Sequence, residues 1–167
     1  MVCVVCVSFG ATSCSSASTA DHTVSTADAY SAAIRWYLDS VDTPTPADTV
    51  GTAPTGPVVV YVAPASGKAI NSQAQASVVR EMSDMTDVVT VRFADARDDA
   101  LQIDVEAMPV KDDGVLLLVG EVPNSTAPVA VKVAVYHDAT DTHTFVMTVT
   151  ESGDSFVATS VSEVVQG

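Results

Sequence analysis

The sequence predicts an α+β domain in which one or two helices pack on a mostly antiparallel, curved β-sheet. Three observations carry this prediction: helical periodicity early in the chain, a strand–helix–strand pattern after it, and then four strands separated by turn residues. Hydrophobic residues make up 47% of the 167 positions and charged residues only 17%, so the chain has enough apolar material for one core.

The first residues have the signature of an export signal. Residues 2–11 are small or mostly aliphatic, which suits a signal peptide but is too short to span a membrane. The segment ATSC, which ends at Cys14, resembles the lipobox of bacterial lipoproteins, where small residues precede a cysteine that is lipidated and becomes the new N-terminus. The resemblance implies a signal peptide over residues 1–13, lipidation of Cys14, and an extracytoplasmic protein that is either a membrane-anchored lipoprotein or secreted.

An apolar N-terminal strand that contains Cys3 and Cys6 is the alternative interpretation of the same segment. A zinc site on these two residues would need two more ligands of the right type, and Cys14 is the one remaining cysteine. We therefore favour export. Residues 14–26 are rich in Ser, Thr and Ala and predict a flexible tether, and residues 27–167 predict a single domain.

Ser25 or Thr26 can cap the first predicted helix, which follows them. Apolar residues recur at helical spacing on one of its faces: Tyr30, Ala33, Ile34, Tyr37, Leu38 and Val41. Trp36 lies off this face, and we expect it to be buried as well, because an exposed tryptophan is costly. Residues 41–57 hold four of the eight prolines and predict a Pro-rich loop, since proline donates no backbone hydrogen bond.

A strand, a helix and a second strand are predicted next. Residues 58–63 form a continuous apolar run, which is typical of a strand buried on both faces. The following helix starts near Asn71, which can cap it, and residues 88–93 predict the second strand. This order predicts a right-handed crossover and a parallel strand pair.

The rest of the chain predicts a run of strands. After an acidic segment (94–109) that fits a short helix or a loop, and a turn at 112–114, four strands are expected, at 115–122, 129–137, 143–150 and 155–164. Pairing His137 with His143 places the apolar rows of the two middle strands on one face. This element order is loosely similar to the NTF2-like and cystatin-like folds, a likeness of order alone.

The net charge restricts the classes of partner. Seven basic residues stand against 21 acidic ones, which gives a formal net charge of −14. Nucleic acid and anionic lipid headgroups both need clustered Lys or Arg. We therefore expect no nucleic-acid binding, and membrane attachment only through a lipid anchor at Cys14.

His137 and His143 are the candidates for a metal site. They end the two strands of a predicted hairpin, with Asp138 and Asp141 nearby, and two imidazoles with carboxylates can hold a divalent metal. The alternative is two polar residues at a solvated turn. We favour that alternative and expect no metal and no cofactor.

Three other patterns are interpreted structurally. Residues 153–156 (GDSF) are similar to the nucleophile block of GDSL-type hydrolases, but Ser155 lies near the end of the chain instead of the start, so a hairpin turn is expected. Gly67 and Lys68 lack the other residues of a phosphate-binding loop. The carboxylates of the acidic segment lack the spacing of a calcium loop and predict a solvated loop: Asp95, Asp98, Asp99 and Asp104.

These observations predict a cell-envelope domain that is exported, and lipid-anchored if Cys14 is modified. We expect a non-enzymatic binding or interaction module whose partner is an envelope protein or a small ligand. Arg35 and Arg92 interrupt apolar elements, and we expect each to pair with an aspartate or to extend to water. The alternative function is a small NTF2-like enzyme, or a small-molecule binder, with a pocket in the curved sheet.

Overall fold

The computed structural model describes residues 22–41, 57–66 and 68–164. The signal segment, Cys14 and most of the Pro-rich loop lie outside these residues. Two helices and six strands follow one another along the chain, with short 3-10 turns between some of them: α1 (Thr26–Val41), β1 (Val58–Pro64), α2 (Ser72–Glu81), β2 (Val89–Phe93), β3 (Val115–Val119), β4 (Val129–Tyr136), β5 (Thr142–Ser152) and β6 (Ser155–Glu163). No helix in this part of the chain is both long and apolar enough to cross a membrane.

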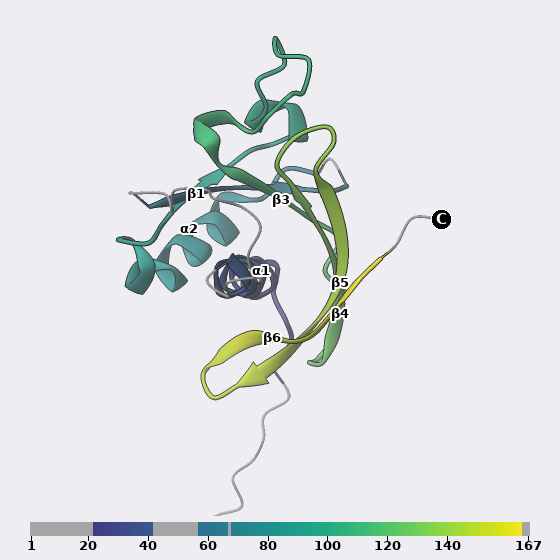
Figure 1. Ribbon diagram of the computed structural model, residues 1–167. Coiled ribbons are helices and arrows are strands. Elements are labelled where there is room, and N and C mark those ends of the chain that lie inside the picture. The colour runs from purple at the N-terminus through teal and green to yellow at the C-terminus, as the bar shows by residue number, and fades with distance from the viewer. Residues whose placement is uncertain (1–21, 42–56, 67, 165–167) are drawn as a thin grey trace, which may run out of the picture.

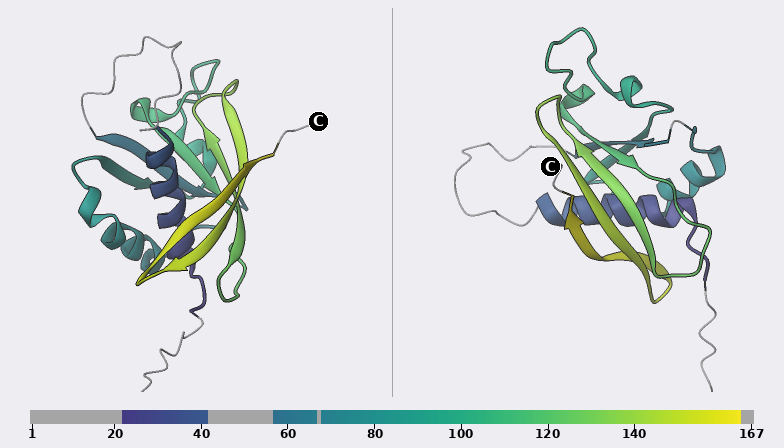
Figure 2. Two further views of the ribbon diagram at one scale, coloured as in Figure 1. Left: turned by 60° about the horizontal axis from the view of Figure 1, so that its bottom comes forward. Right: turned by 90° about the vertical axis from the view of Figure 1, so that its right-hand side faces the viewer.

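The six strands form one mixed sheet in the order β2-β1-β3-β4-β5-β6. β1 pairs in parallel with β2 and β3, and the remaining neighbours pair antiparallel. The predicted α+β class with a mostly antiparallel sheet is thus confirmed, and so is the parallel pair around α2. The sheet curves around α1, which is seen end-on in Figure 1 and lies along the hollow side of the sheet in Figure 2.

Helix α1 fills the concavity of the sheet. Its Ala33 and Ile34 are fully buried, and so are Val60 and Leu117 of the strands that face it. Trp36 is half-buried and packs edge-on against Phe145, with ring centroids 4.9 Å apart. The hollow of the sheet is therefore occupied by core, and the space for a ligand lies at its rim.

Both helices begin with the caps that their sequences predict. The Ser25 hydroxyl accepts a hydrogen bond from the Asp28 amide, and the Asp28 carboxylate accepts one from the Ser25 amide, 2.7 Å away. At α2 the Asn71 side-chain oxygen accepts from the Ala74 amide at 2.8 Å. These bonds fix where each helix starts, and both starts lie beside the cavity described below.

The predicted end of the tether is wrong. Residues 22–26 belong to the domain, because Val24 is 3% exposed and its amide donates to the Ser125 carbonyl at 3.1 Å. Thr23 forms an isolated antiparallel bridge with Thr126. The Ser- and Thr-rich composition suggested a coil, but one apolar side chain and two backbone contacts are enough to dock this end.

The predicted register of the β4–β5 hairpin is wrong by two residues. Val135 pairs with His143 and Tyr136 with Thr142, so His137 is the first residue of the turn. The Asp138 carboxylate accepts from the Thr140 amide at 2.7 Å and from the Asp141 amide at 2.9 Å, which closes the turn around it. Because the shift is even, the apolar rows still share one face: Val131, Val133, Val135, Phe145, Met147 and Val149.

A second cluster of buried residues covers the other face of the sheet. The acidic segment forms a short 3-10 turn (Arg97–Ala100) and a loop. Its Leu101, and Val110 directly after it, pack with Leu116 and Tyr136. The chain therefore passes from β1 to β2 on the α1 side of the sheet, and from β2 to β3 on the opposite side.

Gly114, directly before β3, lies close to the backbone of β1. A Cβ at this position would lie 2.5 Å from the Val59 carbonyl oxygen, whereas a Cβ at Gly120 would lie 3.0 Å from the Lys132 carbonyl oxygen. We predict that Gly114→Ala lowers the free energy of unfolding by about 1–3 kcal/mol, as overpacking does. Gly120→Ala should cost less, and urea unfolding of both variants measures the order. Equal losses, or the reverse order, would show that the approach is not tight.

Candidate functional site

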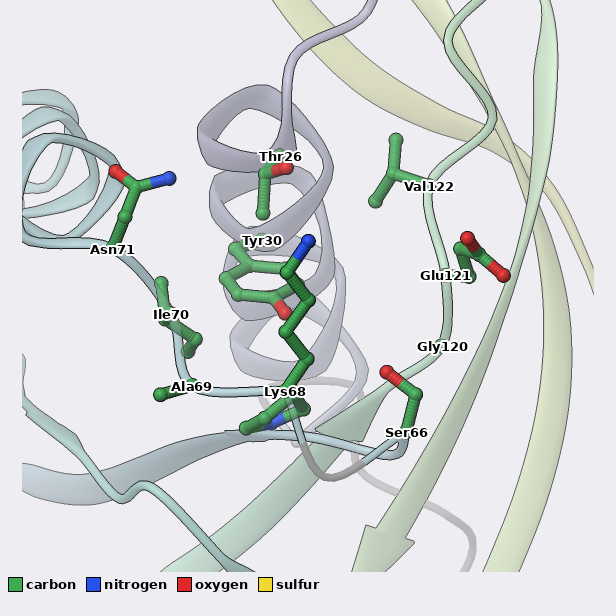
Figure 3. Close-up of a pocket in the computed structure, with 11 residues that line it drawn as sticks. Thr26, Tyr30, Ser66, Lys68, Ala69, Ile70, Asn71, Gly120, Glu121 and Val122 are labelled. Atoms are coloured by element: carbon green, nitrogen blue, oxygen red, sulfur yellow. The ribbon is translucent and has the colours of Figure 1, made fainter.

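A cavity of about 240 Å³ opens at the rim of the concavity, where β1 and β3 end. One wall is the segment between β1 and α2, the opposite wall is the chain that leaves β3, and the floor is the first turn of α1 (Figure 3). The residues that line it are Thr26, Tyr30, Pro64, Ser66, Lys68, Ala69, Ile70, Asn71, Gly120, Glu121 and Val122.

The topology explains why the sheet leaves space here. β1 and β3 are parallel neighbours, with Pro64 paired to Val119, so their carboxyl ends lie at the same edge. From that edge the chain after β1 turns towards α2 and β2, and the chain after β3 turns towards β4. Connections that diverge from adjacent parallel strands leave a crevice, and ligands of open α/β sheets bind in such crevices.

Tyr30 brings the buried polar group of this cavity. The residue is 4% exposed, its side chain lines the cavity, and its hydroxyl has no hydrogen-bond partner among the described residues. Burial raises the pKa of the Tyr30 hydroxyl, so the group stays protonated and can donate. The hydroxyl is open to the cavity, whereas among the described side chains Ser31 Oγ is the polar atom that is shut off from solvent without a partner.

Lys68 brings a positive charge to the same place. Its side chain extends alongside Tyr30 towards the start of α1 in Figure 3, and its ammonium forms no ion pair within the described ranges. Asn71 uses its side-chain oxygen to cap α2, which leaves its amide N–H₂ free to donate. The Glu121 carboxylate points away from Tyr30. The polar groups that face the cavity are therefore mainly donors.

Sequence reasoning missed this site because its parts looked ordinary. The apolar stripe of the first helix predicts a core position for Tyr30, and the structure places it in the core, at the edge that borders the cavity. Lys68 lacks the other residues of a phosphate-loop motif. Tyr30, Lys68 and the helix cap Asn71 come together only in the folded chain, so no local sequence pattern shows the site.

The two candidate metal ligands have different neighbours. The His137 ring lies 6.3 Å from the Tyr37 ring of α1, centroid to centroid. His143 has both ring nitrogens against carboxylates, with Nδ1 2.6 Å from Glu163 and Nε2 3.1 Å from Asp141. In the described part of the chain no group of three or more His, Cys, Asp or Glu side chains is arranged to hold a metal ion.

Ser155 is part of a hairpin turn. Gly153 has a φ of 63°, Ser152 pairs with Ser155, and the Ser155 hydroxyl donates to the Ser152 carbonyl at 3.1 Å. The hydroxyl closes the hairpin on its own backbone, so the predicted turn is confirmed.

The two arginines that interrupt apolar elements both have partners. Arg35 donates to the Asp84 carboxylate at 3.0 Å and to the Glu81 carbonyl. Arg92 pairs with Asp112, and the Tyr61 hydroxyl donates to the same carboxylate at 2.7 Å. These contacts tie neighbouring elements together and leave neither guanidinium free for a ligand.

Two other hollows are larger but lack a buried polar group. One, of about 430 Å³, lies on the convex face of the sheet next to Arg97 and Lys132. The other, of about 520 Å³, follows the acidic loop from Asp98 to Val105, whose residues are mostly exposed. We therefore take the Tyr30–Lys68 cavity as the candidate site.

The contacts of His143 predict how the stability of the domain depends on pH. Its hydrogen bond to Glu163 and the charges of Glu163 and Asp141 raise the pKa of the imidazole above 6.5. This stabilisation is complete below about pH 6.5, the unfolded value, and is lost as the pH rises through the folded pKa. We predict that Glu163→Gln lowers the His143 pKa, measured by NMR titration, and that the stability difference from wild type is larger at pH 6 than at pH 9. The His137 titration is the internal control. An unchanged His143 pKa in Glu163→Gln would contradict the assigned cause.

Comparisons of the chain with protein-family models, with curated proteins and with solved structures found no match. The function of the cavity therefore has to follow from its own geometry and chemistry.

Proposed function

We propose that this chain is an exported domain that binds a small molecule without transforming it, in the cavity between the ends of β1 and β3. The observation that carries the proposal is Tyr30, which is 4% exposed and lines the cavity, and whose hydroxyl has no protein partner among the described residues. The hydroxyl is open to the cavity, so water or a ligand there can accept its hydrogen bond. A ligand that supplies the acceptor gains a hydrogen bond worth about 0.5–1.5 kcal/mol.

The lining chemistry supports binding over catalysis. No His, Cys or Asp is present among the described lining residues, and the carboxylate of Glu121 points away from Tyr30. The titratable groups that face the cavity are Tyr30 and Lys68. Burial raises the pKa of Tyr30 and so disfavours the tyrosinate that a general base would need, which leaves both groups as hydrogen-bond donors for recognition.

Export is supported by the sequence. The apolar stretch before Cys14 and the small residues that precede the cysteine have the composition of a lipoprotein signal. The lipid would be the domain's attachment to a membrane. A cell-envelope binding module is the role that joins this leader to the cavity.

We predict that radiolabelled palmitate is incorporated into the full-length chain when it is expressed in a bacterial host, and that Cys14→Ser abolishes the label. Cys14 is the cysteine that follows the small residues, so Cys3→Ser and Cys6→Ser are the matched controls and should keep it. Equal labelling of wild type and Cys14→Ser would exclude a lipid on this residue.

We predict that small fragments bind at the cavity in a ligand-observed NMR screen and shift the amide resonances of Thr26, Lys68 and Gly120. Tyr30→Phe keeps the ring and removes the hydroxyl, so it should weaken the polar fragments by roughly 2- to 10-fold, the value of one hydrogen bond. Tyr37→Phe, also buried on α1, is the matched control and should change nothing. Fragments that shift only residues on the convex face, such as Leu118 and Lys132, would refute the site.

A further inference from the structure

We infer that the ligand of the cavity is a small oxyanion, that is, a molecule that presents a carboxylate or a phosphate group to Tyr30 and Lys68. The inference rests on the proposed function and specifies its ligand class. It is carried by the combination, in one cavity, of a tyrosine that is 4% exposed and whose hydroxyl has no protein partner among the described residues, and a lysine ammonium that forms no ion pair among them.

The donors converge from three elements. Tyr30 comes from α1, Lys68 from the connection after β1, and Asn71 from the start of α2. A carboxylate or phosphate accepts several hydrogen bonds at once, and charge-assisted bonds of this kind are the stronger ones. A neutral ligand would leave the ammonium without a counterion.

The dipoles of α1 and α2 add to the positive potential of the cavity. Thr26 is the first residue of α1 and Asn71 caps α2, so two helix N-termini border the cavity. Each carries about half a positive charge from its aligned peptide dipoles. The caps of Ser25 and Asn71 already use some of the first-turn amides, which leaves Tyr30 and Lys68 as the specific contacts.

The charges of the chain bear on this site. Arg35 and Arg92 are neutralised by aspartates, whereas other described cations besides Lys68 form no ion pair: Arg80, Arg97, Lys111 and Lys132. Lys68 differs from these in lying beside Tyr30 in the cavity, where the lining carboxylate of Glu121 points away from Tyr30. The cavity thus combines a positive charge with neutral donors in a chain of net charge −14.

The size of the cavity limits the ligand. Its volume of about 240 Å³ is below the roughly 300–1,000 Å³ of sites for drug-sized molecules. A short carboxylic acid or a phosphate group with a small substituent fits, and a nucleotide does not fit as a whole.

The test compares charged and neutral probes of one shape on the full chain. Acetate, its neutral isostere acetamide, and inorganic phosphate are titrated at constant ionic strength, and amide shifts at Thr26, Lys68 and Gly120 are followed by NMR. We expect acetate or phosphate to bind about tenfold or more tightly than acetamide, because neutral acetamide cannot form a charge-assisted hydrogen bond with the Lys68 ammonium. The stronger of the two anions identifies the carboxylate or the phosphate as the source.

Matched variants locate the charge. Lys68→Met should weaken the anion about tenfold or more, while Lys132→Met, which removes an equal charge on the convex face, should leave it unchanged. Tyr30→Phe should weaken it several-fold, and its thermal unfolding confirms that the variant is folded. Equal losses for Lys68→Met and Lys132→Met would show non-specific attraction and overturn the inference.

The outcomes separate the two proposals. If acetamide or other neutral fragments bind at Tyr30 as tightly as acetate, the cavity remains a ligand site and the oxyanion assignment fails. If neither charged nor neutral probes shift the cavity residues, both proposals fail together.

Discussion

The fold depends on the burial of α1 in the hollow of the sheet. Small side chains make this possible, since Ala29, Ala32 and Ala33 are almost fully buried and let the helix approach the strands closely. The sheet curves to cover the helix on several sides, as Figure 1 shows. The same burial decides where a ligand can bind, because the concavity of the sheet is filled with core residues. What remains is the rim, where the first turn of α1 meets the ends of β1 and β3.

The rim is held by contacts from distant parts of the chain. Thr23 and Val24 pair with the segment that follows β3, through the Thr126 bridge and the Ser125 carbonyl. That segment begins with the Gly120–Val122 wall of the cavity. The residues just before α1 therefore secure one wall, and the helix that follows them supplies the floor. A chain anchored upstream of this point would enter the domain next to its own binding site.

Local patterns predicted the elements well because their signals are local. The stripe on α1, the Asn71 cap and the run at 58–63 each depend on neighbouring residues, and the structure confirms them. The hairpin at His137 was placed two residues off, because the hydrophobic rows fix the face but not the length of the turn, which Asp138 decides. The docking of Val24 depends on a contact with residues about 100 positions later, and no local signal announces it.

The candidate site could not be predicted either, because long-range contacts bring its residues together. Its groups come from residues 26–30, 66–71 and 120–122, and none of these short segments has a motif. What makes Tyr30 notable is its missing partner, which is a property of the packed structure and not of the residue. The unpaired state of Lys68 is likewise defined by what its neighbours are, in a chain with three times as many acids as bases. The Tyr30 hydroxyl opens into the cavity without a protein partner, so water or a ligand accepts its hydrogen bond, and Lys68 places a positive charge beside it.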